Sequence, residues 1–155
     1  MDNNILPEIL NWKLREVISC VKLISSDSSK FKHDILEKLK LPISSGYKFD
    51  ASMTEIDWKN MSKHYYFYFD KVGWEENIKS AFEESKLKET KNLLITYGFK
   101  EPVVIIPTKV FLEDWDGFIA STVYQSLMFS EDFKLIMEIS RDYYLHSNFE
   151  ILTNG

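Results

Sequence analysis

Two apolar runs with very little chain between them constrain the fold more than any other feature of the sequence. The first is residues 92–99, NLLITYGF, and the second is residues 102–108, PVVIIPT. Both are rich in branched aliphatic side chains, as β-strands are. A parallel connection needs a dozen or more residues, so a joint this short predicts an antiparallel hairpin. Pro102 and Pro107 then stand at strand ends, where a missing N–H is tolerated.

A second hairpin is predicted near the C-terminus, and one more strand earlier in the chain. Residues 133–140, FKLIMEIS, and residues 143–151, YYLHSNFEI, are separated only by Arg141 and Asp142. Residues 64–70, HYYFYFD, form an aromatic run of the kind found in strands. We therefore expect about five strands.

Between these runs, apolar side chains recur at helical spacing. Helices are predicted over residues 5–24, 28–41, 73–90 and 109–125. Together with the strands they predict a single α+β domain over residues 1–155. We expect a largely antiparallel sheet, with the two N-terminal helices and the two further helices packed on one face of it.

Negative charge is concentrated in the C-terminal third. Residues 1–50 carry eight basic and seven acidic side chains, and residues 51–100 carry eight of each. Residues 101–155 carry three basic and nine acidic side chains, so this third holds the whole imbalance behind the net charge of −5. Such a field repels nucleic acid and attracts cationic partners. The simpler interpretation is a solvated acidic face that aids solubility.

The most closely spaced acids surround Trp115 in the stretch 111–120, FLEDWDGFIA. On a helix, Glu113 and Asp116 share a face, whereas Asp114 lies on another side, so the three do not converge on one pocket. The first turns of a helix also favour acids through the helix dipole. Three interpretations remain, in order of preference: exposed acids without a further role, a partner-binding surface, and a metal site or acid/base pair.

No motif for catalysis or metal binding stands out. His33, His64 and His146 show no paired spacing, and Cys20 lies alone in an apolar segment, unlike the ligands of zinc sites. The five glycines do not cluster into a phosphate-binding loop. One acid/base arrangement stays open, because paired strands could bring His64 close to Asp142. We expect no catalytic residues, no cofactor and no metal.

Nucleic acid and membranes are not favoured as partners. The interleaved aromatic and basic residues of 63–71, KHYYFYFDK, superficially resemble a base-stacking platform, but the surrounding charge does not support one. No apolar run approaches the roughly 20 residues that span a bilayer. The first ten residues lack the basic start and apolar core of a secretory signal. A lone cysteine excludes an intrachain disulfide and favours a reducing compartment, so we expect a cytoplasmic protein.

A small, acidic, aromatic-rich α+β chain without catalytic motifs resembles the immunity proteins of bacterial toxin systems, including contact-dependent growth inhibition and other polymorphic toxins. The resemblance is one of size, composition and charge over the whole chain. It implies a protein, monomeric when free and not an enzyme, that binds and neutralises a cognate toxin domain. Many such domains are cationic nucleases. The alternative is a non-catalytic subunit or adaptor of a constitutive cytosolic assembly, or a homodimer. The residues predicted to contact the partner are Glu113, Asp114, Asp116, Tyr124, Glu131 and Asp132.

Overall fold

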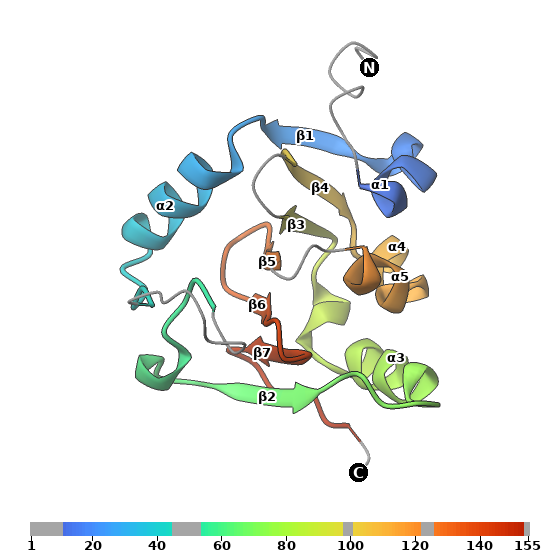
Figure 1. Cartoon of the computed structure of the whole chain (residues 1–155). Helices are drawn as coiled ribbons and strands as arrows, with labels where there is room; N and C mark the ends of the chain where they lie inside the picture. The colour runs from blue at the N-terminus through green and yellow to red at the C-terminus, as the bar shows by residue number, and fades with distance from the viewer. Residues whose placement is uncertain (1–10, 45–53, 98–100, 122–125, 154–155) are drawn as a thin grey trace.

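One antiparallel sheet of seven strands, in the order β1-β4-β3-β5-β6-β7-β2, organises the fold (Figure 1). The computed structural model describes residues 11–44, 54–97, 101–121 and 126–153. In Figure 1 the sheet extends from β1 at the top to β2 at the bottom, and these two strands are its edges. The strands are β1 (Lys22–Ser25), β2 (Tyr65–Tyr68), β3 (Asn92–Thr96), β4 (Val103–Pro107), β5 (Ser126–Ser130), β6 (Ile136–Ile139) and β7 (Tyr144–Ser147).

Both predicted hairpins are confirmed as antiparallel strand pairs. Leu93 of β3 pairs with Ile106 of β4, and Glu138 of β6 pairs with His146 of β7. Residues 98–100 of the joint between β3 and β4 lie outside the described residues. The aromatic run predicted as a strand is β2, which pairs with β7.

The prediction of about five strands is wrong, because β1 and β5 bring the sheet to seven. All five residues of β5 are buried, so its sequence lacks the polar–apolar alternation that marks a half-exposed strand. β1 lies within the apolar stretch that was predicted to continue as a helix to residue 24. Its exposed residues, Lys22 and Ile24, alternate with the partly buried Leu23 and Ser25.

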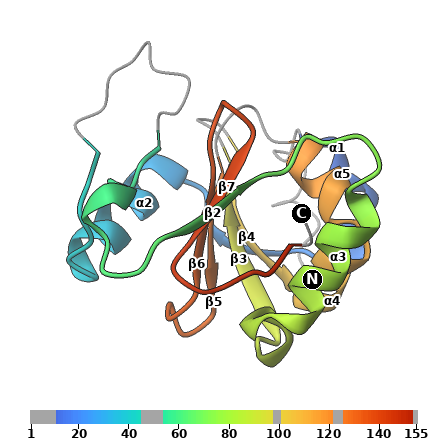
Figure 2. The same ribbon diagram turned by 90° about the horizontal axis from the view of Figure 1, so that it is seen from below.

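Helices cover both faces of the sheet, which corrects the prediction that they pack on one face. Figure 2 shows α1, α3, α4 and α5 on one side and α2 on the other. The central strands β3 and β5 bury side chains on both faces, so the second face also needs a cover. The helices are α1 (Trp12–Glu16), α2 (Ser28–Lys38), α3 (Glu75–Glu84), α4 (Thr108–Glu113) and α5 (Trp115–Ala120).

The first predicted helix, over residues 5–24, is much shorter in the structure. α1 ends at Glu16, and Val17 leaves the helical conformation with φ −107° and ψ 26°. The 3-10 helix Ile18–Cys20 then leads directly into β1. Residues 5–10 of the predicted helix lie outside the described residues.

The fourth predicted helix, over residues 109–125, is divided into α4 and α5 at Asp114. Asp114 has φ −147° and ψ 53°, and its side chain accepts a hydrogen bond from the backbone N–H of Gly117 at 3.2 Å. A Cβ at Gly117 would lie 2.3 Å from a carboxylate oxygen of Asp114, so this cap needs glycine. Residues 122–125 lie outside the described residues.

An apolar core lies on each side of the sheet. The larger one, under α1, α3, α4 and α5, contains the ring contacts of Phe82 with Phe111 at 5.7 Å and with Trp115 at 5.8 Å. The smaller one, under α2 and the 3-10 helix η3 (Trp58–Asn60), contains Ile35 and Trp58 itself.

Candidate partner-binding site

A cleft of about 440 Å³ opens at one end of the sheet. It is bordered by the end of β2, the start of α3, α5, and the turn between β6 and β7. Phe69, Trp115 and Ile119 give it an apolar wall. The indole N–H of Trp115 donates a hydrogen bond to the backbone oxygen of Glu75 at 3.0 Å, which fixes α5 against the start of α3.

Three acidic side chains, Asp70, Glu75 and Asp116, line this cleft. The pKa of Asp116 is raised, first because the carboxyl is partly withdrawn from water and then because Glu75, Asp114 and Asp70 add negative charge around it. The ionised form of Asp116 is therefore destabilised by its surroundings, and a cationic group brought by a partner would relieve the repulsion between the carboxylates.

Basic and aromatic side chains complete the cleft. Lys71 and Arg141 belong to the lining, and the Nζ of Lys71 lies 4.0 Å from the centre of the Trp74 ring, in a cation–π contact. Tyr143 also lines the cleft and is 51% exposed. Its ring stands edge-on to Phe69 at 6.0 Å. Acidic, basic, apolar and aromatic groups thus meet in one cleft, and such a combination suits the anchoring of a partner's side chain.

The predicted contact residues fall into two separate groups. Asp116 lines the cleft, and Glu113 and Asp114 precede it at the junction of α4 and α5. Glu131 and Asp132 lie in the turn before β6, whereas the cleft borders the turn after β6. These two acids are therefore at the opposite end of that strand from the cleft.

Three of the predicted acids are also engaged within the protein, and one of them, Glu131, accepts a hydrogen bond from the side-chain amide of Asn92 at 2.8 Å. The Nζ of the buried Lys13 lies 2.6 Å from a carboxylate oxygen of Asp114. Asp132 accepts hydrogen bonds from the hydroxyl of Ser130 at 2.7 Å and from the backbone N–H of Lys134 at 3.0 Å. Tyr124 lies outside the described residues. Of the predicted set, Asp116 is the residue that lines the cleft.

Sequence reasoning missed Asp70 and Glu75 as partners of Asp116. Asp70 follows β2 and Glu75 begins α3, both far from Asp116 along the chain. The pairing of β2 with β7 and the contact of Trp115 with Glu75 bring these three acids together. The one available signal was the position of Asp70 as the last residue of a predicted strand.

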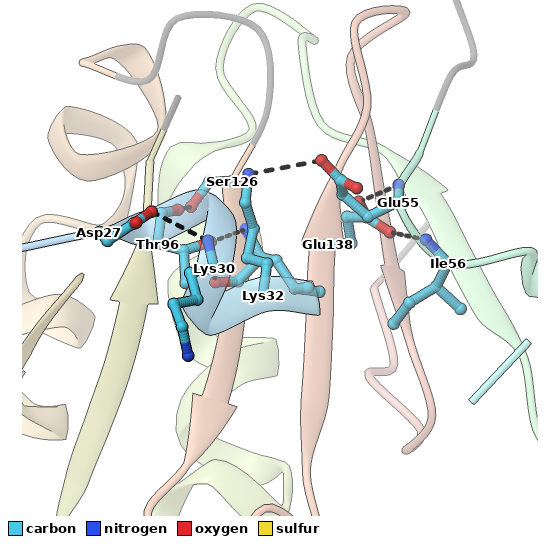
Figure 3. Close-up of polar contacts among 9 residues, drawn as sticks. Asp27, Lys30, Lys32, Glu55, Ile56, Thr96, Ser126 and Glu138 are labelled. Atoms are coloured by element: carbon cyan, nitrogen blue, oxygen red, sulfur yellow. Dashed lines mark hydrogen bonds and ion pairs between the residues drawn. The ribbon is translucent and has the colours of Figure 1, made fainter. Parts of the chain in front are cut away.

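A second group of ionisable residues lies on the face of the sheet that α2 covers. Glu138 is fully buried and accepts hydrogen bonds from the backbone N–H groups of Glu55 at 2.6 Å and Ile56 at 3.2 Å, which Figure 3 shows. It also accepts one from the indole N–H of Trp58 at 2.9 Å. Burial raises the pKa of Glu138 to about 7, although the three donors favour the ionised form. Glu138 therefore anchors the segment that precedes β2 to the sheet.

His64 and His146 lie beside this anchor. Nε2 of His64 is 2.9 Å from Nδ1 of His146, so one ring donates a hydrogen bond to the other. Trp58 stacks on both rings, at 5.3 and 5.8 Å between centroids. Burial lowers the pKa of His146 to about 4, and the positive charge of His64 acts in the same direction. His146 is therefore uncharged at neutral pH.

His64 and Asp142, which the sequence left open as an acid/base couple, are connected through His146 and Ser140. Nε2 of His146 is 3.3 Å from the Oγ of Ser140, and the hydroxyl of Ser140 donates to Asp142. A serine nucleophile must direct its hydroxyl at a histidine base, whereas Ser140 directs it at a carboxylate. Ser140 is also only 2% exposed. These residues therefore form a partly buried polar chain without the geometry of a nucleophile and its base.

Within the part of the chain that the structure describes, no group of three or more His, Cys, Asp or Glu side chains is placed to hold a metal ion. No helix in the same residues is long and apolar enough to cross a membrane. No family model matches the chain, and no curated protein matches it either.

Proposed function

We propose that the protein binds and neutralises a cationic bacterial toxin domain in the cytoplasm, without catalysis, as the immunity proteins that its sequence resembles do. The observation that carries this proposal is the cleft that gathers Asp70, Glu75 and Asp116 beside an apolar and aromatic wall. The expected partner is a protein with a basic surface.

Two physical effects would support binding: long-range electrostatic attraction of the partner, and contacts in the cleft that are shielded from water. The net charge of −5 attracts a cationic domain over a distance and speeds its encounter. Once the partner is in place, a basic side chain in the cleft would be paired with carboxylates and shielded from water by Trp115 and Tyr143. Aromatic side chains in such positions commonly supply most of the binding energy of an interface.

Protection of living cells is the direct test. The proposal predicts that a cytotoxic domain is encoded next to this protein, and that domain would be expressed in a bacterial host with and without this protein. We expect growth to be arrested by the domain alone and restored by the pair. Growth arrest that persists at equal expression of both chains would refute the proposal.

The cleft itself is tested by charge reversal on the purified pair. Glu75→Lys with Asp116→Lys should weaken binding of the toxin domain by at least about tenfold and reduce its dependence on salt. Glu131→Lys with Asp132→Lys is the matched control, because it changes the net charge equally at the far end of β6. Equal losses in both variants would mean that total charge, rather than the cleft, governs binding. Light scattering should show a monomer, whereas a stable homodimer would favour the alternative of a constitutive assembly.

A further inference from the structure

The two edge strands of the sheet are protected against further pairing to different degrees. β1 begins at the exposed Lys22, and its register with β4 shifts between Leu23 and Ser25. A charge and a bulge are common devices that prevent another strand from adding to an edge. β2 has the sequence YYFY and pairs with β7 in unbroken register. It contains no lysine, proline or register shift.

The outer edge of β2 offers the backbone groups of Tyr66 and Tyr68. The N–H of Phe69 donates to the carbonyl of Tyr143 at 2.9 Å, so Phe69 directs its backbone groups toward β7. Successive residues of a strand alternate in this direction, so Tyr66 and Tyr68 direct theirs away from β7. Among the described residues, no strand pairs with β2 on that side. The side chain of Tyr66 is 62% exposed and that of Tyr65 is 38% exposed.

This edge leads directly into the acidic cleft. Asp70 follows Tyr68 by two residues and lines the cleft together with Glu75 and Asp116. A strand that paired along β2 would therefore bring one of its ends to these carboxylates. Backbone pairing alone does not select a sequence, whereas the excess of acidic over basic side chains in the cleft, three against two, favours positive charge.

We propose that the open edge of β2 takes up an extended basic segment of the partner protein as an eighth strand, with a Lys or Arg side chain of that segment entering the cleft. This inference rests on the proposed function, because it specifies how the toxin domain is held. The lining of the cleft carries three acidic side chains against two basic ones, so its charge favours a basic segment. A second copy of this chain, whose β2 lies between Lys63 and Lys71, is distinguished from such a segment by the oligomeric state of the free chain. Main-chain hydrogen bonds to β2 supply the affinity, and the cleft supplies the preference for a basic segment.

Two synthetic ten-residue peptides test the inference on the full chain. One alternates valine with arginine, and the other alternates valine with glutamate. Hydrogen exchange of the backbone amides of Tyr66 and Tyr68 is followed by NMR. We expect the arginine peptide, at saturation, to slow exchange at both amides by about tenfold or more, because strand pairing buries these N–H groups. The glutamate peptide should have no effect. Exchange that stays unchanged with both peptides would overturn the inference.

Variants separate the edge from the cleft. Tyr66→Pro removes an outward N–H, and its ring obstructs pairing from outside, while the ladder to β7 is kept. It should abolish binding of the arginine peptide with an unchanged circular dichroism spectrum. Asp70→Asn with Asp116→Asn should weaken binding of the arginine peptide by about fivefold or more, since two charge pairs are lost. Glu131→Gln with Asp132→Asn is the control and should leave the affinity for this peptide unchanged. If Tyr66→Pro does not fold, the exchange measurement on the unmodified chain decides.

Failure of this inference is distinguishable from failure of the proposed function. If the toxin complex forms but Tyr66 and Tyr68 still exchange freely in it, the proposed function stands and the inference is overturned. If cells are not protected while the arginine peptide still slows exchange along β2, basic-strand docking stands and the toxin-binding function does not. A free chain that is dimeric, and becomes monomeric with Tyr66→Pro, would assign the edge to a second copy and overturn the inference.

Discussion

The two faces of the central sheet differ in what they bury. The face under α1, α3, α4 and α5 is apolar, and Phe82, Phe111 and Trp115 meet ring to ring on it. The face under α2 and η3 also buries apolar side chains, but it encloses Glu138 and partly encloses His146. The first face is thus stabilised mainly by packing, together with the ion pair of the buried Lys13 with Asp114. The stability of the second face depends on the protonation of two enclosed groups, so the larger part of the response of this fold to pH between about 4 and 7 should come from the second face.

The largest loss of stability is expected from a substitution that creates a cavity on the apolar face. Phe82 is completely buried and contacts the rings of Phe67, Phe111 and Trp115. Phe82→Ala should lower the free energy of unfolding by about 4 kcal/mol, because the surrounding rings cannot close the space. Urea denaturation at pH 5 and pH 8 measures this loss.

The same measurement tests the contrast between the faces. The loss caused by Phe82→Ala should be equal at the two pH values, because none of its ring partners titrates in that range. A loss that changes with pH would show that the two faces are coupled through the sheet.

The next largest effect is expected from Glu138. Its pKa is raised by burial from an ordinary 4.5 to about 7, so the folded chain holds a proton that the unfolded chain releases between these values. The stabilisation from this group is present at low pH and is lost as pH rises through 7. Glu138→Gln does not titrate. The difference in unfolding free energy, wild type minus variant, should therefore fall between pH 5 and pH 8 by an amount of the order of 3 kcal/mol.

A matched variant controls for the loss of contacts at this site. Trp58→Phe removes the indole donor to Glu138 but leaves the carboxyl able to titrate. It should lower stability at every pH and retain a pH dependence of the same sign as the wild type. If Glu138→Gln and the wild type show parallel curves, Glu138 does not titrate in this range.

Much of the fold follows from local patterns in the sequence. The hairpin joints force antiparallel neighbours, so β3–β4 and β6–β7 are predicted correctly. β5 is missed because a central strand buried on both faces shows no alternation. The break at Asp114 is missed because the pattern of apolar residues continues through it. A side-chain cap to Gly117 interrupts the helix without changing that pattern.

The candidate sites depend more on contacts between distant segments. Asp116 stands out because it lies in an acid-rich stretch, whereas Asp70 and Glu75 become its neighbours only through packing. Alternation along β6 places Glu138 on the same side as Ile136, away from Met137 and Ile139. It does not reveal that the segment containing Trp58 closes over that side and supplies the donors. Sequence pattern gives the direction of a side chain, and tertiary contacts decide its burial.

His146 should make the smallest contribution to the pH dependence of stability, and its sign should be opposite to that of Glu138. Burial and the charge of His64 lower its pKa from an ordinary 6.5 to about 4, although Asp142 opposes the shift. The unfolded chain therefore takes up this proton first as pH falls, so the stabilisation present above pH 6.5 is lost on the way to pH 4. Because His146 is only partly buried and solvent screens its charge, we expect a contribution of about 1 kcal/mol.

Between pH 4.5 and 6.5 the two groups on this face act against each other. Acidification stabilises the fold through Glu138 and destabilises it through His146. Glu138→Gln should therefore make the chain more sensitive to acid, whereas His146→Gln should make it less sensitive, with a residual slope from His64, whose pKa burial also lowers. Urea midpoints at pH 4.5, 5.5 and 6.5 measure both slopes. Slopes of the same sign in the two variants would contradict the assignment of opposing protonation equilibria to this face.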